Sequence, residues 1–212
     1  MKPILLGVDS LSYSSFLKCN PRVLGTLFGS TYRGVVVNKD LKKPFAAWAK
    51  VLGFKEIPQT FMAGVKPETV PLIEQTGAVP VNIPITNPSL GEVSFSFSED
   101  VNIEEETKAV ADAILEKAKS KPVIASIISF EKLLTKEDKC SLYSKVDSFI
   151  GKVLSKADDF ILFSPYGEPK GNTLEDYGIF LASVPRPSEH ETVKLEEIGY
   201  LFNKLAKGEA FY

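Results

Sequence analysis

The chain has 212 residues, and its 25 basic and 27 acidic side chains give a net charge of -2. A general nucleic-acid binder carries a basic excess, so this balance argues against that class. Hydrophobic residues make up 44% of the chain, which supplies enough apolar surface for a packed core and excludes long disordered tracts. We expect a single domain over residues 1–212.

Targeting signals and cysteines bear on the cellular compartment. The N-terminal apolar run stops at Asp9, and no stretch approaches the roughly 20 apolar residues of a membrane span. We therefore expect a cytoplasmic protein without a membrane partner. Cys19 and Cys140 form no CxxC pair, so we expect two buried or half-buried thiols in a reducing cytosol. The surplus of Lys over Arg and the scarcity of Gln are typical of thermophiles.

Short apolar runs rich in β-branched residues alternate with segments of helical period. Such runs are typical of strands in a sheet that is covered on both faces, and their alternation with helices predicts an α/β fold with a mainly parallel sheet. The predicted strands are Lys2–Val8, Gly34–Val37, Val79–Ile83, Val123–Ile128, Asp159–Phe163 and Gly178–Ser183.

Five helices are predicted between the strands from capping residues and apolar stripes. The first helix has Asn20 as its cap and Pro21 at its first position, and the second is Pro67–Thr76, which ends at Gly77. The third is Glu104–Lys119. Thr135 caps the fourth, with the apolar stripe Leu142 to Val153, and Thr192 caps the last, with the apolar stripe Leu195 to Leu205. The irregular segment Ile83–Asp100 is predicted as a loop with a short edge strand at Val93–Phe97.

Several standard sites are excluded by composition. His190 is the only histidine, and it lies in a polar, Pro-rich loop that is typical of a solvated side chain. With Cys19 and Cys140 it does not readily complete a zinc site. The chain has no Walker lysine loop and no GxGxxG. Carboxylate-only Mg²⁺ or Ca²⁺ sites remain open.

Asp9 is the most informative single residue. It follows an apolar strand, and ligands of α/β sheets bind at the carboxyl ends of strands. A carboxylate there suits a metal or ligand site, although Asp9 could also cap the Ser-rich segment that follows.

Six segments of the chain are similar to motifs of one enzyme family and follow one another in the same order as in that family. They are Ile4–Ser10, Asn20–Leu24, Pro44–Trp48, Val81–Pro88, Val146–Gly151 and Phe163–Gly167. They resemble the type I phosphodiesterase and nucleotide pyrophosphatase branch of the alkaline phosphatase superfamily. The resemblance implies a three-layer α/β/α sandwich with an alkaline-phosphatase-like core. It also implies an ancestral site in which two metal ions activate a Thr or Ser nucleophile, with Asp9 as one metal ligand.

The departures from the family pattern concern the site itself. The nucleophile position falls on Pro44, which has no hydroxyl. The family's Asp-His pair falls on Pro165 and Tyr166, and its other ligands fall near Ser129, Leu133 and Leu174. A phenol binds a metal ion only in its ionised form, and ionisation near neutral pH costs free energy because the pKa of tyrosine is about 10. The resemblance therefore implies loss of the two-metal chemistry, no resident cofactor and no catalytic residue.

Three functions remain open at this point. The first is an inactive phosphodiesterase-like or phosphatase-like domain that binds a small phosphate-bearing ligand or a protein partner, in a pocket lined by Asp9, Ser10, Pro44, Ser164, Tyr166 and Asn172. The second is a phosphodiesterase or phosphatase that uses divalent metals such as Zn²⁺ or Mn²⁺, with Asp9 joined by Asp40, Glu175 or Asp176. The third is a structural or assembly subunit, for which Val93–Phe97 and Ala210–Tyr212 could form an interface, for example in a homo-oligomer. The cluster Lys39, Lys42, Lys43, Lys50 and Lys55 could meet phosphate, but a solvated face is the simpler interpretation.

Overall fold

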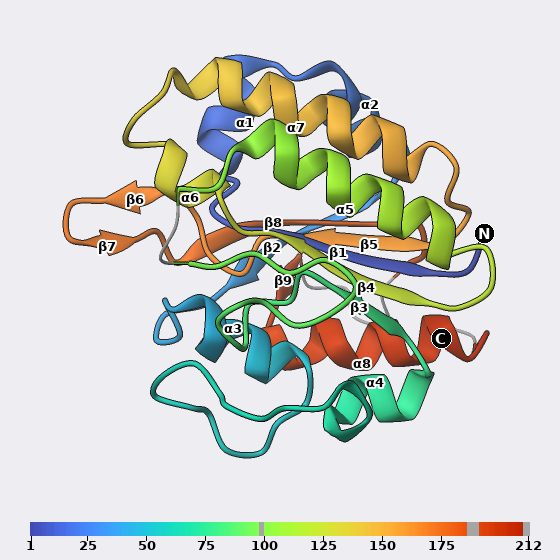
Figure 1. The fold of residues 1–212 in the computed structure, drawn as a ribbon. Coiled ribbons are helices and arrows are strands. Elements are labelled where there is room, and N and C mark those ends of the chain that lie inside the picture. The colour runs from blue at the N-terminus through green and yellow to red at the C-terminus, as the bar shows by residue number, and fades with distance from the viewer. Residues whose placement is uncertain (98–99, 186–190, 210–212) are drawn as a thin grey trace.

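The computed structural model describes residues 1–97, 100–185 and 191–209, and its centre is one seven-stranded sheet (Figure 1). The spatial order is β3-β4-β1-β5-β8-β2-β9, and among these strands β8 alone runs antiparallel to its neighbours. All six predicted strands are present. Their bounds are β1 (Ile4–Val8), β2 (Tyr32–Val37), β3 (Val79–Val81), β4 (Val123–Ile127), β5 (Phe160–Phe163) and β8 (Tyr177–Ala182), with β9 (Thr192–Val193) added at the edge.

Helices cover both faces of this sheet, which confirms the predicted three-layer α/β/α sandwich (Figure 1). One layer consists of α1 (Tyr13–Cys19), α2 (Arg22–Ser30), α5 (Ile103–Lys117) and α7 (Lys139–Leu154). The other consists of α3 (Pro44–Val51), α4 (Pro71–Thr76) and α8 (Leu195–Ala206). Shorter elements are a 3-10 turn at Pro67–Thr69, α6 (Phe130–Leu133) and the hairpin of β6 (Pro169–Lys170) and β7 (Thr173–Leu174). Each face of the sheet has its own apolar cluster, so the core has two halves.

Several helix boundaries differ from the sequence prediction. Thr135 and Thr192 are not caps: Asp138 accepts the Ser141 N–H at the start of α7, while Thr192 lies in β9. Asn20 ends α1 in the left-handed region at φ 49°, which leaves Pro21 as the N-cap of α2. The predicted helix at 67–76 divides at Pro71, because proline has no N–H for the preceding turn. Its end at Gly77, with φ 67°, is confirmed.

The predicted edge strand at Val93–Phe97 is wrong. This segment folds back on the loop after β3 instead of joining the sheet: Asn82 N donates to Val93 O and Ser89 N donates to Phe95 O. Val93 still packs against the apolar core on one face of the sheet, although it belongs to no strand. As a result the Phe97 ring packs against that of Phe61.

Cys19 and Cys140 are joined by a disulfide, with a Cα–Cα distance of 5.1 Å. The expectation of two thiols is therefore wrong. The bond joins the last residue of α1 to the first turn of α7, across a sequence separation of 121 residues. Sequence spacing could not indicate this pairing, because it depends on how both helices pack on the same face of the sheet.

Within the part of the chain that the structure describes, no helix combines the length and the apolar character needed to cross a bilayer.

Candidate functional site

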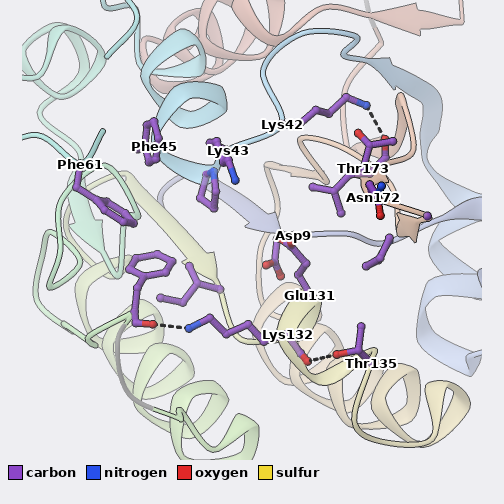
Figure 2. Close-up of a pocket in the computed structure, with 16 residues that line it drawn as sticks. Asp9, Lys42, Lys43, Phe45, Phe61, Glu131, Lys132, Thr135, Asn172 and Thr173 are labelled. Atoms are coloured by element: carbon purple, nitrogen blue, oxygen red, sulfur yellow. Dashed lines mark hydrogen bonds between the residues drawn. The ribbon is translucent and has the colours of Figure 1, made fainter. Parts of the chain in front are cut away.

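The loops that follow β1, β2 and β4 meet at one end of the sheet, because these three strands point in the same direction. A cleft of about 790 Å³ lies there (Figure 2). Its walls come from the residue after β1, the start of α3, the chain from β4 through α6, and the β6–β7 hairpin. This is the position at which α/β sheets bind ligands.

Two carboxylates, those of Asp9 and Glu131, lie at the floor of the cleft (Figure 2). Asp9 is 6% exposed, and its Oδ1 is buried without a hydrogen-bond partner among the described residues. Burial raises the pKa of Asp9 well above its usual value, and the negative charges of Glu131 and Glu106 raise it further. Burial also raises the pKa of Glu131. The pair therefore favours holding a proton over carrying two charges.

Tyr166 lies behind this pair and is fully buried. Its hydroxyl donates to Glu131 Oε2 at 3.5 Å. Burial raises the pKa of Tyr166, and the charges of Glu131 and Asp9 add to that effect. The raised pKa favours the neutral phenol, which donates its hydrogen bond to Glu131.

Glu106 supports the floor, and the sequence analysis missed it. It lies in α5, fully buried, and accepts hydrogen bonds from Asn82 Nδ2 (2.8 Å), Ile128 N (2.9 Å), Ser129 N (3.1 Å) and Ser129 Oγ (2.6 Å). These bonds fix the chain that leads from β4 into α6. A signal was present in the sequence, because Glu106 occupies a core-facing position three residues after Ile103 and four before Val110.

Lysines surround the cleft but differ in how they are held. Lys42 Nζ donates to Asp176 Oδ1 at 2.8 Å and to Leu174 O at 2.9 Å. Lys132 Nζ donates to Phe97 O (Figure 2). The Lys43 side chain is exposed, and its ammonium has neither a hydrogen bond nor an ion pair with another described residue. Of the predicted basic cluster, Lys39 and Lys50 line a different recess and Lys55 is exposed.

An aromatic wall, made by Phe45, Phe61 and Phe97, forms one side of the cleft (Figure 2 labels the first two). The ring centroids of Phe45 and Phe61 are 5.1 Å apart, and those of Phe61 and Phe97 are 4.8 Å apart. The first turn of α3 contributes Phe45 and two loops contribute the other rings, so periodicity in the sequence could not identify the wall.

The predicted pocket residues divide into two groups. Asp9, Pro44 and Asn172 line the cleft. Ser10, Ser164 and Tyr166 are fully buried and do not line it. Ser10 Oγ and Ser164 Oγ, like Asp9 Oδ1, lack a partner among the described residues.

The other predicted groups lie elsewhere. Asp176 pairs with Lys42, and Asp40 lines the separate recess that also holds Lys39. Glu175 contributes its backbone to the hairpin region, where its N–H donates to Glu168 O. His190 and the predicted terminal interface Ala210–Tyr212 fall outside the described residues.

The donor set does not fit a two-metal centre. The described residues gather no group of three or more His, Cys, Asp or Glu side chains that could hold a metal ion. At the positions that the resemblance assigns to ligands, Ser129 is engaged with Glu106, Leu133 packs against the core and Leu174 is buried. Among the described residues that line the cleft, Asp9 and Glu131 are the ones that carry carboxylates.

The buried Asp9 carboxyl should lower the stability of the protein at neutral pH. Its pKa in the folded state is raised, so its contribution to the free energy of unfolding falls as pH rises from about 4 through the raised pKa. Asp9→Asn removes this ionisation, and we expect it to stabilise the protein at pH 8, with a gain that shrinks toward pH 4. Urea denaturation at several pH values measures this change.

Asp176→Asn is the matched control for that substitution. The Lys42 ammonium beside Asp176 lowers the pKa of this carboxyl, so the ionised form of Asp176 stabilises the fold, whereas that of Asp9 destabilises it. We expect a small loss of stability at pH 8 that disappears under acid conditions. If Asp9→Asn also destabilised the protein at pH 8, Asp9 would be a satisfied structural carboxylate.

Comparisons with known proteins were made by sequence and by structure. No protein-family model and no curated protein sequence matches the chain. Among solved structures, an inactive variant of murine ectonucleotide pyrophosphatase/phosphodiesterase 5 in complex with AMP has a TM-score of 0.66 at 10% identity, covering 98% of this chain and 95% of that chain. The PH0037 protein from Pyrococcus horikoshii has a TM-score of 0.64 at 9% identity, with 100% and 98% covered. Alkaline phosphatase from the Antarctic bacterium TAB5 has a TM-score of 0.63 at 13% identity, with 97% and 98% covered. The chain therefore has the fold of the alkaline phosphatase superfamily.

Proposed function

We propose that this chain uses an alkaline phosphatase fold to bind a phosphate-bearing ligand without hydrolysing it. The observation that carries the proposal is Pro44, which lines the cleft at the first residue of α3. The sequence resemblance places the nucleophile at this position, and proline offers no hydroxyl for attack on phosphorus. The carboxylates that remain at the floor do not complete a metal centre that could replace it.

The walls of the cleft support an anionic ligand that carries a planar ring. The exposed Lys43 ammonium is available to pair with a phosphate oxygen. The raised pKa of Asp9 favours the protonated carboxyl, which in that form donates a hydrogen bond to the same group. The aromatic wall offers ring faces on which a base can stack. A nucleoside phosphate has both parts, and the murine structural neighbour binds AMP.

Isothermal titration calorimetry with AMP and with inorganic phosphate tests the proposal, each in excess EDTA. We expect AMP to bind without a divalent cation. Phe61→Ala should weaken AMP binding about tenfold or more and leave phosphate binding unchanged, because base–aromatic stacking contributes about 1–3 kcal/mol. Lys43→Ala should weaken both ligands. Lys55→Ala is the matched control, because Lys55 is exposed and lies outside the cleft.

The opposite result would favour the metal-dependent hydrolase. The metal-free protein is titrated with Mn²⁺, Zn²⁺ and Mg²⁺, as wild type and as Asp9→Ala, and phosphoester turnover is measured in parallel. Stoichiometric metal binding together with turnover, both lost in Asp9→Ala, would overturn the proposal. Absence of AMP and phosphate binding in the wild type would also contradict it.

A further inference from the structure

The disulfide lies at the surface, beside a recess of about 350 Å³. Cys140 is exposed, whereas Cys19 is half-buried and packs against the core. Arg22, Tyr143 and Asp147 are among the residues that line the recess. Because Cys140 is exposed and lines this recess, we expect a small dithiol to reach its sulfur without unfolding of the chain.

Tyr143 connects the disulfide region with two other segments. It lies one helical turn after Cys140, and its side chain is fully buried. Its hydroxyl accepts the Ser12 N–H at 2.9 Å and donates to Glu168 Oε1 at 2.9 Å. Lys139, the residue before Cys140, donates to the second oxygen of Glu168 at 2.8 Å. Burial raises the pKa of Tyr143, so the phenol stays protonated and keeps both bonds.

Both segments lead into the cleft. Ser12 lies three residues after Asp9, on the loop that joins β1 to α1. Glu168 immediately precedes the β6–β7 hairpin, whose residues Pro169, Gly171, Asn172, Thr173 and Leu174 line one wall. The position of the first turn of α7 therefore fixes the floor loop and the hairpin wall together.

The short helix α1 depends on this attachment. It has seven residues, its N-cap residue Ser12 makes no side-chain capping bond to it, and Leu17 on it is 71% exposed. Helices of this length are not stable alone, so tertiary contacts must hold α1 in place. The disulfide adds a covalent bond to these contacts and fixes the end of α1 to α7.

We propose that Cys19–Cys140 is a thiol–disulfide exchange site for a dithiol reductant, and that its reduction loosens the Asp9 loop and the hairpin wall of the cleft. A reductant thiolate attacks the sulfur of Cys140, which forms a mixed disulfide and releases the Cys19 thiolate. The second thiol of the reductant, as thiolate, then attacks the reductant's first sulfur in the mixed disulfide and releases the Cys140 thiolate. The reductant becomes a disulfide, two electrons pass to the protein, and both cysteine thiolates take up protons.

The first test is reduction under native conditions with dithiothreitol, followed by alkylation and mass spectrometry. We expect both cysteines to be alkylated while the far-ultraviolet circular dichroism stays that of the folded protein. A disulfide that resists dithiothreitol until the chain unfolds would overturn the exchange site.

The second test is hydrogen exchange of the ligand-free protein, so it does not depend on the proposed function. In the reduced protein we expect amides of residues 9–19 and 166–174 to exchange at least about tenfold faster relative to those of α4 and α8 on the opposite face. Tyr143→Phe, measured with the disulfide intact, should reproduce the faster exchange, because it removes both hydroxyl bonds and keeps the ring. Cys19→Ser/Cys140→Ser should match the reduced protein and no longer respond to dithiothreitol. Unchanged exchange in these two segments, or a uniform increase over the chain, would overturn the coupling.

Discussion

Glu106→Ala should lower the free energy of unfolding by about 3–5 kcal/mol, because a buried donor left without an acceptor costs about 1–3 kcal/mol and the lost side chain adds a cavity. Four donors converge on the Glu106 carboxylate, from Asn82, Ile128 and Ser129. Alanine leaves these donors without that acceptor inside the protein and also leaves a cavity. Urea denaturation, with the midpoint and slope fitted together, measures the loss.

Two further substitutions separate the hydrogen bonds of Glu106 from a general effect of charge. Glu105→Ala removes a carboxylate from the neighbouring exposed position and should change stability by less than about 0.5 kcal/mol. Glu106→Gln keeps the volume but replaces one acceptor with an amide donor that would face N–H groups, so it should recover only part of the loss. If Glu106→Gln were as stable as the wild type, the carboxylate network would not be what stabilises the region.

The same substitution should also affect the cleft. Ile128 and Glu131 line it, and the chain that carries them starts at the two N–H groups bound by Glu106. We therefore expect Glu106→Ala to weaken AMP binding even under conditions where the protein is still folded. Glu105→Ala should leave AMP binding unchanged. Glu106 is in this sense a positioning residue, because it acts through the loop that it holds.

Gly199→Ala and Gly25→Ala should have opposite effects on stability, although both place alanine in a helix. A Cβ at Gly199 would lie 2.0 Å from Val51 O, a backbone atom at the end of α3. A Cβ at Gly25, in α2, would meet no atom within 4 Å. We expect Gly199→Ala to destabilise the protein by about 3 kcal/mol through overpacking. Gly25→Ala should stabilise it by up to about 1 kcal/mol, the difference in helix propensity between glycine and alanine.

Thermal and urea denaturation of the two variants measure this difference in sign. The collision at Gly199 matters for the site because α3 begins with Pro44 and Phe45, which line the cleft. The absence of a side chain at Gly199 lets α8 approach the other end of that helix. Equal effects of the two substitutions would mean that α8 can move away from α3 without cost, and the close approach would then not position the cleft wall.

Local sequence patterns were sufficient for most of the fold. Runs such as Ile4–Val8 and Val123–Ile127 are buried strands at the predicted positions, because continuous apolar β-branched residues are stable only inside a covered sheet. The helix from Ile103 was recognised from its stripe, and the end at Gly77 from the left-handed conformation that glycine tolerates. The resemblance carried by Ile4–Ser10 and the five other segments led to the alkaline phosphatase fold, and the comparisons with solved structures show that fold.

The short elements were missed because they lack a complete local pattern. α1 has seven residues and α3 has eight, which is too short for a clear apolar stripe. The reversed direction of β8 also has no local signal, since a buried strand has the same composition in either direction.

The sequence by itself determined the strands, the longer helices and the placement of Asp9 after the first strand. Only the tertiary structure decided which distant residues meet: Cys19 with Cys140, Glu106 with the chain after β4, and the three phenylalanines of the aromatic wall. The physical reason is the range of each interaction. Helix and strand periodicity arises between neighbours in the chain, whereas a disulfide, a buried carboxylate network and a ring wall require packing of segments that are far apart in sequence.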